Sequence, residues 1–273
     1  MKHFTIGSAA VGSERLLVIA GPCLVESAEM CMEVAAHLKR ACATRELPFV
    51  FKASYRKANR SSGRSYSGPP VAEGLAALAR VRRELGVAVL TDVHETVEVD
   101  AAAEVVDALQ IPAFLSRQTD LIQAAGRTGR AVNVKKGQFM APDDMRQVVD
   151  KLVAAGCERI LLTERGTSFG YHDLVVDLRG ILVMRELGWP VVYDATHSLQ
   201  RPGGEASGGE RRHAFPLMRA AIACGADALF FETHPDPDRA LSDAATQLPL
   251  AQVEAFLDEA RRIRDAVAER AHA

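Results

Sequence analysis

Eight short apolar segments rich in β-branched residues recur along the chain. They lie at residues 16–21, 49–54, 87–93, 108–114, 131–137, 159–166, 191–197 and 228–234. Between them lie stretches with the period of an amphipathic helix, for example residues 71–86, 143–155, 174–188 and 214–224. Continuous apolar strands that alternate with helices indicate a parallel sheet buried on both faces. Eight such units in one chain favour a closed (β/α)₈ TIM barrel of the α/β class over an open doubly wound sheet.

The two ends of the chain complete this picture. Residues 1–12 are predicted to form a short strand or hairpin that caps the N-terminal end of the barrel, and residues 250–270 to form the eighth outer helix. No change in composition and no low-complexity linker divides the 273 residues. The sequence therefore predicts a single catalytic domain spanning residues 1–273.

Composition narrows the classes of partner. The formal net charge of −2 gives no general attraction to nucleic acid or to an anionic membrane. No apolar run approaches the roughly 18 residues needed to span a bilayer. The N-terminus does not have the pattern of a signal peptide, and five irregularly spaced cysteines do not suggest a disulfide framework. We therefore expect a cytoplasmic protein that binds neither nucleic acid nor membrane.

Polar residues follow most of the predicted strands. In a (β/α)₈ barrel the C-terminal ends of the strands surround one shared site. The residues at or just after these ends are Cys23, Lys52, Asp92, His94, Gln110, Ala113, Lys135, Lys136, Glu164, Arg165, Asp194, His197, Glu232 and His234. So many polar groups directly after apolar strands predict an active site at this end.

One segment of this site is strongly cationic. The segment 47–72 contains two lysines and three arginines and no acidic residue, in a chain that is slightly acidic overall. Lys135 and Arg165 would add positive charge at the same end of the barrel. Arginine matches phosphate or carboxylate with a fork of donors, and lysine supplies a mobile point charge. The alternatives are a pocket for one or two small polyanions, which we favour, and a solvated loop.

A second group of residues has the chemistry of a metal site. Cys23, His197 and Glu232 follow strands that become neighbours when the barrel closes, and Asp243 lies in the loop after the last strand. A thiolate, an imidazole and two carboxylates suit a divalent transition metal. The alternative for Cys23 is a small buried apolar residue. Asp92, at another strand end, would act behind the site or accept a proton.

At this point the motifs resemble a known family. The runs IAGPCLVES, FKASYRKANRSS, TDVHE, IPAFLSRQTDL, VNVKKGQF, LTERGTSFGY, YDATHSLQ and FETHPDP are similar to those of the 3-deoxy-D-manno-octulosonate 8-phosphate synthases, in order from about Leu16 to the last helix. The resemblance implies a (β/α)₈ barrel that condenses phosphoenolpyruvate with D-arabinose 5-phosphate and water and releases phosphate. It also implies a homotetramer that works in lipopolysaccharide core biosynthesis.

The resemblance also assigns residues to roles. Phosphoenolpyruvate would be bound by Lys52 and Lys57 at its carboxylate and by Gln110, the Ala113 backbone, Lys135 and Arg165 at its phosphate. Arabinose 5-phosphate would be bound by Asn59, Arg60 and Ser61, with Arg60 reaching across a subunit interface. Lys57, Asp92, Lys135 and His197 would be the catalytic residues. The metal ligands would be Cys23, His197, Glu232 and Asp243.

The family has a metal-dependent branch with cysteine at the first ligand position and a metal-independent branch with asparagine. Cys23 therefore implies one divalent ion per subunit, such as zinc, iron or manganese. The stretch 200–212 resembles the family's mobile loop but is shorter than in relatives of the metal branch. The roles of Arg201, Arg211 and Arg212 in it stay open.

Three alternatives remain at this stage. The related 3-deoxy-D-arabino-heptulosonate 7-phosphate synthases use erythrose 4-phosphate, and they carry a Lys-Pro-Arg-Thr motif where this chain has KANRSS at residues 57–62. An aldolase that forms a Schiff base could use Lys52 or Lys135 as its nucleophile. A phosphosugar-binding barrel without catalysis is the third.

Overall fold

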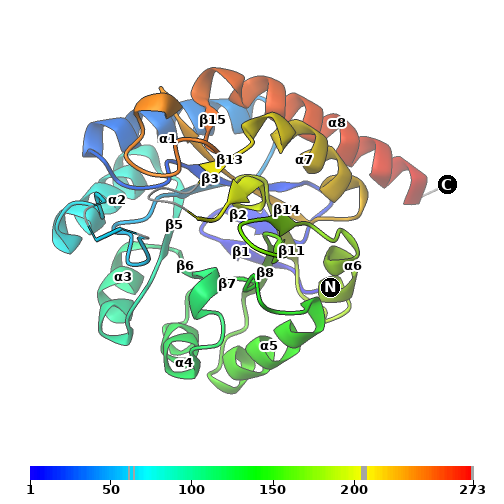
Figure 1. Ribbon diagram of the computed structural model, residues 1–273, viewed down its shortest axis with the longest axis horizontal. Helices are drawn as coiled ribbons and strands as arrows, with labels where there is room; N and C mark the ends of the chain where they lie inside the picture. Colours follow the sequence, from blue (N-terminus) through cyan, green and yellow to red (C-terminus); the bar gives the residue numbers. More distant parts are fainter. Residues whose placement is uncertain (61, 64, 204–207, 272–273) are drawn as a thin grey trace.

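Eight parallel strands close into a barrel in the computed structural model, which describes residues 1–60, 62–63, 65–203 and 208–271. The strands are β3 (Leu17–Gly21), β4 (Phe49–Lys52), β5 (Ala88–Asp92), β6 (Ala108–Ile111), β7 (Ala131–Lys135), β8 (Ile160–Glu164), β11 (Val191–Asp194) and β14 (Ala228–His234). Each strand pairs in parallel with the next. The pairs β11–β14 and β14–β3 close the ring (Figure 1). The predicted (β/α)₈ barrel is confirmed.

Helices surround this barrel on the outside (Figure 1). They are α1 (Ala28–Ala43), α2 (Val71–Leu85), α3 (Val99–Val105), α4 (Thr119–Arg127), α5 (Met145–Ala154), α6 (Arg179–Arg185), α7 (Ala214–Ala223) and α8 (Val253–Ala271). In α1, Ser27 accepts a hydrogen bond from the Met30 N–H and so caps the first turn. Cys31 and Cys42 lie on the buried face of α1, as an apolar stripe requires. Among the described helices, none is long and apolar enough to cross a membrane.

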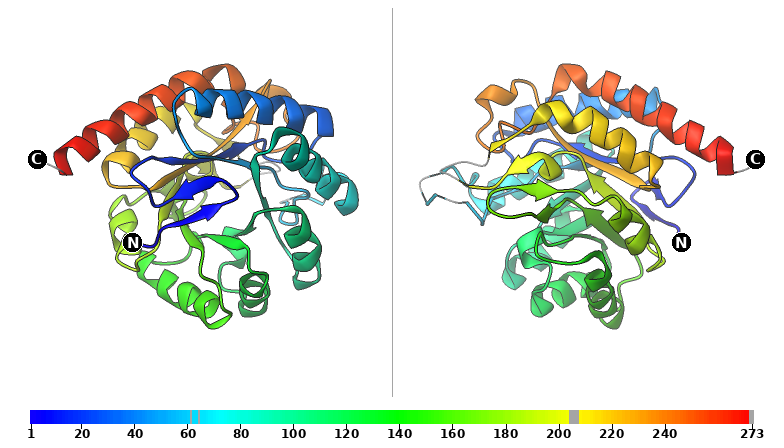
Figure 2. Two further views of the ribbon diagram at one scale, coloured as in Figure 1. Left: turned by 180° about the vertical axis from the view of Figure 1, so that it is seen from behind. Right: turned by 45° about the vertical axis from the view of Figure 1, so that its right-hand side comes forward.

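A two-stranded hairpin covers the N-terminal end of the barrel (Figure 2, left). Strand β1 (Phe4–Ile6) pairs antiparallel with β2 (Ala9–Val11). Ile6, Ala9 and Val11 are buried in one cluster with inward-facing barrel residues such as Leu17 and Leu90. The hairpin therefore fills the N-terminal opening, as predicted for residues 1–12.

One predicted helix is wrong in its first part. The sequence pattern gave a helix over 174–188, but Leu174–Val175 form strand β10, which pairs antiparallel with β9 (Thr167–Ser168). Helix α6 begins only at Arg179, whose N–H donates to the Asp177 side chain. The local antiparallel pairing and this cap outweigh the helical period. The remaining short strands are β12 (Gln200–Arg201), β13 (Gly208–Gly209) and β15 (Leu248–Pro249).

Candidate active site

The two-residue period of the strands produces the site. The buried cluster inside the barrel includes Val50, Leu90, Val192 and Phe230. Two positions further along, on the same inner face, each strand carries a polar side chain: Lys52, Asp92, Asp194 and Glu232. The same step leads from Ala108 to Gln110, from Asn133 to Lys135 and from Thr163 to Arg165. The barrel interior therefore changes from apolar to charged toward its C-terminal end.

These side chains surround a cavity of about 540 Å³ at the C-terminal end of the barrel. Its lining includes, of the residues predicted from the sequence, Lys52, Lys57, Asn59, Arg60, Asp92, Gln110, Ala113, Lys135, Arg165, His197 and Asp243. Cys23 and Glu232 are almost fully buried and lie beside this cavity rather than in its lining. Ser61 lies outside the described residues. Apart from Ser61, the predicted site residues lie together.

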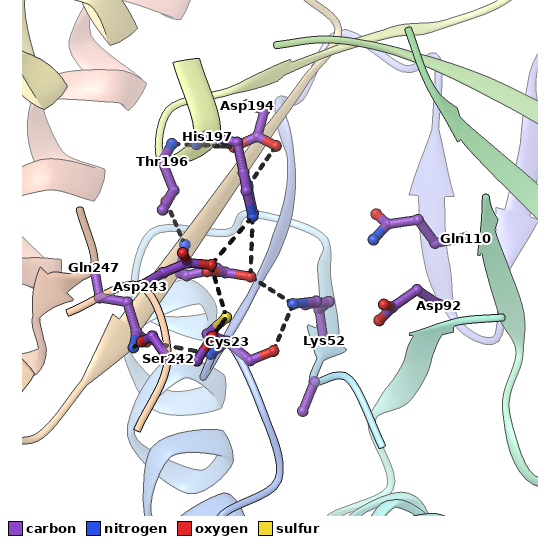
Figure 3. Close-up of polar contacts among 12 residues, drawn as sticks. Cys23, Lys52, Asp92, Gln110, Asp194, Thr196, His197, Ser242, Asp243 and Gln247 are labelled. Atoms are coloured by element: carbon purple, nitrogen blue, oxygen red, sulfur yellow. Dashed lines mark hydrogen bonds and ion pairs between the residues drawn. The ribbon is translucent and has the colours of Figure 1, made fainter. Parts of the chain in front are cut away.

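The four predicted metal ligands converge at one side of the cavity, where Figure 3 shows Cys23, His197 and Asp243 close together. Ligand atoms of Cys23, Glu232 and Asp243 all lie within 4.8 Å of one another. The Nε2 atom of His197 is 3.7 Å from Glu232 Oε1 and 3.8 Å from Asp243 Oδ2. Asp243 has a φ of 48°, a left-handed conformation that costs energy in most residues other than glycine. This conformation therefore occurs at a predicted metal ligand.

The orientation of His197 is fixed by the carboxylate behind it. Its Nδ1 lies 2.9 Å from Asp194 Oδ2, an oxygen that also accepts a hydrogen bond of 2.7 Å from Lys135 Nζ. A carboxylate on Nδ1 stabilises the tautomer that leaves the Nε2 lone pair free, which is how histidine ligands of metals are usually held. Nε2 therefore faces Glu232 and Asp243 as a potential ligand atom.

The acidic residues and Cys23 have the electrostatics of a cation site. Burial raises the pKa of the Cys23 thiol, and the Asp243 and Glu232 carboxylates raise it further. Burial opposes ionisation of Glu232, but Lys52 and His197 outweigh it and hold the pKa of Glu232 below its usual value. Lys52 donates to Glu232 Oε1 at 2.6 Å, while the buried Oε2 has no partner among the described residues. An unpartnered, ionised oxygen beside a thiol and an imidazole fits a divalent metal ion.

Two cationic side chains of the cavity, Lys57 and Arg165, differ in how their charges are compensated. Burial opposes the charge of Lys57, but Cys23, Glu232 and Asp92 raise its pKa overall, so it stays an ammonium ion. Arg165 is buried and makes no ion pair among the described residues, and its Nη1 has no hydrogen-bond partner. Asp194, Asp243 and Glu164 attract this guanidinium only from a distance, so a buried guanidinium with an unpartnered N–H group favours an anionic ligand.

The opposite side of the cavity carries Asp92 and Gln110 (Figure 3). Burial raises the pKa of Asp92, but Lys57, His94 and Lys52 outweigh it and lower the value to about 2. His94 Nε2 lies 3.3 Å from Asp92 Oδ2, so His94 can orient this carboxylate. Gln110 Oε1 accepts from Asn133 Nδ2 at 3.0 Å, which aims the amide group of Gln110. Both polar groups are therefore pre-oriented.

Sequence reasoning missed three side chains that hold the site together. Ser242 Oγ lies 3.0 Å from Cys23 Sγ and accepts from Arg60 Nη1 at 2.8 Å. Gln247 Oε1 accepts from the Cys23 N–H, and Gln200 contacts both Arg165 and Asp243. Ser242 and Gln200 come within one to three residues of predicted ligands, which was a usable signal. Gln247 had none, because only the folded loop brings it to Cys23.

Two comparisons with known proteins agree with this geometry. The model of the DAHP synthetase I family matches residues 5–269. A protein of Syntrophobacter fumaroxidans named 2-dehydro-3-deoxyphosphooctonate aldolase is 54% identical over 271 residues, 97% of this chain and 94% of that protein. Proteins of the same name from Trichlorobacter lovleyi and Syntrophotalea carbinolica are also 54% identical, over 94% and 91% of this chain and 95% and 90% of those proteins. The chain belongs to the DAHP synthetase I family and, within it, to the 2-dehydro-3-deoxyphosphooctonate aldolases.

Proposed function

We propose that this chain condenses phosphoenolpyruvate with D-arabinose 5-phosphate and water to give 3-deoxy-D-manno-octulosonate 8-phosphate and phosphate, with one divalent metal ion per subunit. The name of its relatives supports an eight-carbon product. The same name argues for arabinose 5-phosphate as the aldose over erythrose 4-phosphate, although the family model carries the name of the heptulosonate enzymes.

One observation carries the proposal. Two arginines of the cavity are each connected to a candidate metal ligand through one neutral side chain. Ser242 connects Arg60 to Cys23, and Gln200 connects Arg165 to Asp243. A cation site flanked by two anion-binding groups suits two phosphorylated substrates that must meet at the metal.

The charges of the substrates explain why the cavity is so cationic. Each phosphomonoester carries about −1.5 to −2 charges near neutral pH, and phosphoenolpyruvate adds a carboxylate. Bringing the two together requires compensation in a site where water screens little. Lys52 and Lys57 would hold the carboxylate, Lys135 and Arg165 the phosphate of phosphoenolpyruvate, and Asn59 and Arg60 the sugar phosphate.

The reaction forms a carbon–carbon bond and a bond between C2 and water, and it releases phosphate. C3 of phosphoenolpyruvate attacks the aldehyde carbon, which becomes an alcohol. Water adds to C2, and the resulting hemiketal phosphate collapses and expels phosphate. With its pKa lowered to about 2, Asp92 is too weak a base to hold a proton near neutral pH. Oriented by His94, its carboxylate would instead accept a hydrogen bond from the substrate or the attacking water. The arginines and lysines keep both substrates in contact throughout.

Cys23, His197, Glu232 and Asp243 would hold the metal. The unpartnered Glu232 oxygen and the support of His197 by Asp194 are the observations that favour an ion there. A bound divalent ion would supply Lewis acidity to orient and polarise the aldehyde or the attacking water. The cysteine in this set is the reason we assign the chain to the metal-dependent branch.

A phosphate-release assay tests the proposal. We expect phosphate release with phosphoenolpyruvate and arabinose 5-phosphate, little with erythrose 4-phosphate, and none after a chelator removes the metal. Borohydride added with substrate should trap no adduct on Lys52 or Lys135. Faster turnover with erythrose 4-phosphate would contradict the assigned aldose, and a trapped lysine adduct would contradict the mechanism.

We further propose that the chain works in the cytoplasm as a homotetramer. Several apolar side chains near the C-terminal end of the barrel are exposed, among them Phe114, Phe139 and Phe169. Phe114 also lines the cavity, so apolar surface extends to the edge of the site. Such surface supports contact with another copy of the chain. Sedimentation of the purified protein would measure its assembly size.

A further inference from the structure

Gln200 lies between Arg165 and Asp243, to which the proposed function gives different roles. It begins strand β12, directly after the turn that carries His197, and is half-buried in the wall of the cavity. Its Oε1 accepts from Arg165 Nη2 at 2.8 Å, and its Nε2 donates to Asp243 Oδ1 at 3.0 Å. One amide therefore bridges a predicted phosphate-binding residue and a predicted metal ligand.

The two ends of the amide suit their partners. Arginine only donates hydrogen bonds and an ionised aspartate only accepts them, so the carbonyl must face Arg165 and the NH₂ must face Asp243. Glutamate would repel Asp243, and asparagine is one methylene too short to span the same atoms. Glutamine satisfies both groups at once.

The hydrogen bond from Gln200 determines which carboxylate oxygen of Asp243 faces the other predicted metal ligands. Gln200 holds Oδ1, while Oδ2 lies 3.1 Å from Cys23 Sγ and 3.8 Å from His197 Nε2. Asp243 sits in a loop outside the barrel strands, so no strand register fixes its side chain. The hydrogen bond from Gln200 fixes the carboxylate instead.

The contact with Arg165 orients the guanidinium without neutralising it. Gln200 engages Nη2, and the buried Nη1 has no partner among the described residues. A carboxylate at position 200 would form an ion pair with Arg165 and compete with an anionic ligand. Because the Gln200 carbonyl is neutral, it leaves the positive charge of Arg165 available to an anionic substrate.

We propose that Gln200 is a positioning residue that sets Arg165 for the phosphate of phosphoenolpyruvate and Asp243 for the metal ion through a single amide. This inference rests on the proposed function. It predicts that one substitution changes two properties, metal affinity and the KM for phosphoenolpyruvate, and leaves the KM for arabinose 5-phosphate nearly constant.

The test compares Gln200→Met, which keeps the length but loses both hydrogen bonds, with Gln200→Glu, which keeps only the bond to Arg165. Gln147→Met, on the exposed face of α5, is the matched control. The readouts are the Kd for Zn²⁺ by competition with a chromogenic chelator, the KM for each substrate, and Tm. For Gln200→Met we expect the Kd for Zn²⁺ and the KM for phosphoenolpyruvate to rise by about 10-fold, typical for loss of a group that supports a metal ligand.

Gln200→Glu discriminates a positioning role from a merely structural one. Because Glu neutralises Arg165, its KM for phosphoenolpyruvate should rise at least as much as that of Gln200→Met, although a hydrogen bond is retained. A structural anchor would predict the reverse order, or an equal rise in both KM values with a lower Tm, and either result overturns the inference. Zn²⁺ affinity and KM values like those of Gln147→Met overturn it while leaving the proposed function intact. Turnover by the unmodified chain after all divalent metal has been removed refutes the metal part of both the inference and the proposed function.

Discussion

Cys23 is the residue on which the proposed metal dependence rests. Its thiol is buried beside Asp243 and Glu232, which disfavour the thiolate unless a cation is present. We expect Cys23→Ala to lose metal and to lower kcat by roughly 100-fold or more, because both ligation and the ligand geometry are lost. Metal content and phosphate release measured on the same sample check this.

The matched control for that change is Cys224→Ala. Cys224 is half-buried after α7 and precedes β14, so it lies toward the N-terminal end of the barrel, away from the site. It should keep full metal content and activity. Full activity of rigorously metal-free unmodified protein, or of Cys23→Ala without bound metal, would refute a metal-dependent mechanism.

Substitutions of Arg60 and Arg165 should each raise the KM for a different substrate. Arg60→Ala is expected to raise the KM for arabinose 5-phosphate by roughly 10- to 100-fold with little change for phosphoenolpyruvate, since a charge-assisted contact to one phosphate is lost. Arg165→Ala should show the opposite pattern and serves as the matched control. Steady-state kinetics with each substrate varied in turn give both constants. Equal effects on both substrates in either variant would contradict the assigned roles.

At the scale of elements, the sequence predicted the barrel strands better than the loops and helices that surround them. Each apolar run became a barrel strand, because burial on both faces leaves a pattern that local sequence shows directly. The residues at strand ends followed from the same register, and three of the four candidate metal ligands, Cys23, His197 and Glu232, are among them. The contact of Gln247 could not be predicted, because only the folded loop brings it to Cys23, and for Ser242 and Gln200 the sequence offered only their nearness to predicted ligands. The helix expected at 174–188 failed in its first part because Leu174–Val175 pair with Thr167–Ser168.

The register of β7 and β8 also places an ion pair outside the barrel. Lys135 and Arg165 face the cavity, so their neighbours Lys136 and Glu164 point away from it. Lys136 Nζ lies 3.5 Å from Glu164 Oε1 in a fully buried setting, and burial lowers the pKa of Lys136 and raises that of Glu164. This pair joins the two strands that carry the predicted phosphate-binding residues.

Removal of one partner should therefore destabilise the protein strongly. Lys136→Met alone leaves Glu164 as an uncompensated buried charge, and we expect a loss of about 3–5 kcal/mol in the free energy of unfolding. The double variant Lys136→Met with Glu164→Gln should lose clearly less. Urea unfolding of the single and double variants measures the difference. Additive losses would show that the two charges do not stabilise each other.

At the scale of the whole molecule, the two ends of the barrel differ in their roles. Charged side chains that bind ligands lie at the C-terminal end, and the hairpin of β1 and β2 seals the N-terminal end with apolar residues. A closed barrel has no sheet edge to protect, but its open N-terminal end would expose the inner apolar layer to water. The hairpin is therefore a stability element remote from the chemistry.

This separation gives a test in which stability and catalysis respond independently. Ile6 is fully buried against the inner layer, so Ile6→Ala should cost about 2–5 kcal/mol of unfolding free energy through lost burial and a cavity. Both KM values should stay unchanged below the unfolding temperature, because the hairpin lies at the opposite end of the barrel from the cavity. Val97→Ala, at a position 82% exposed, should change the stability little. A rise in either KM of Ile6→Ala, measured where the protein is fully folded, would mean that the two ends of the barrel are coupled through its apolar interior.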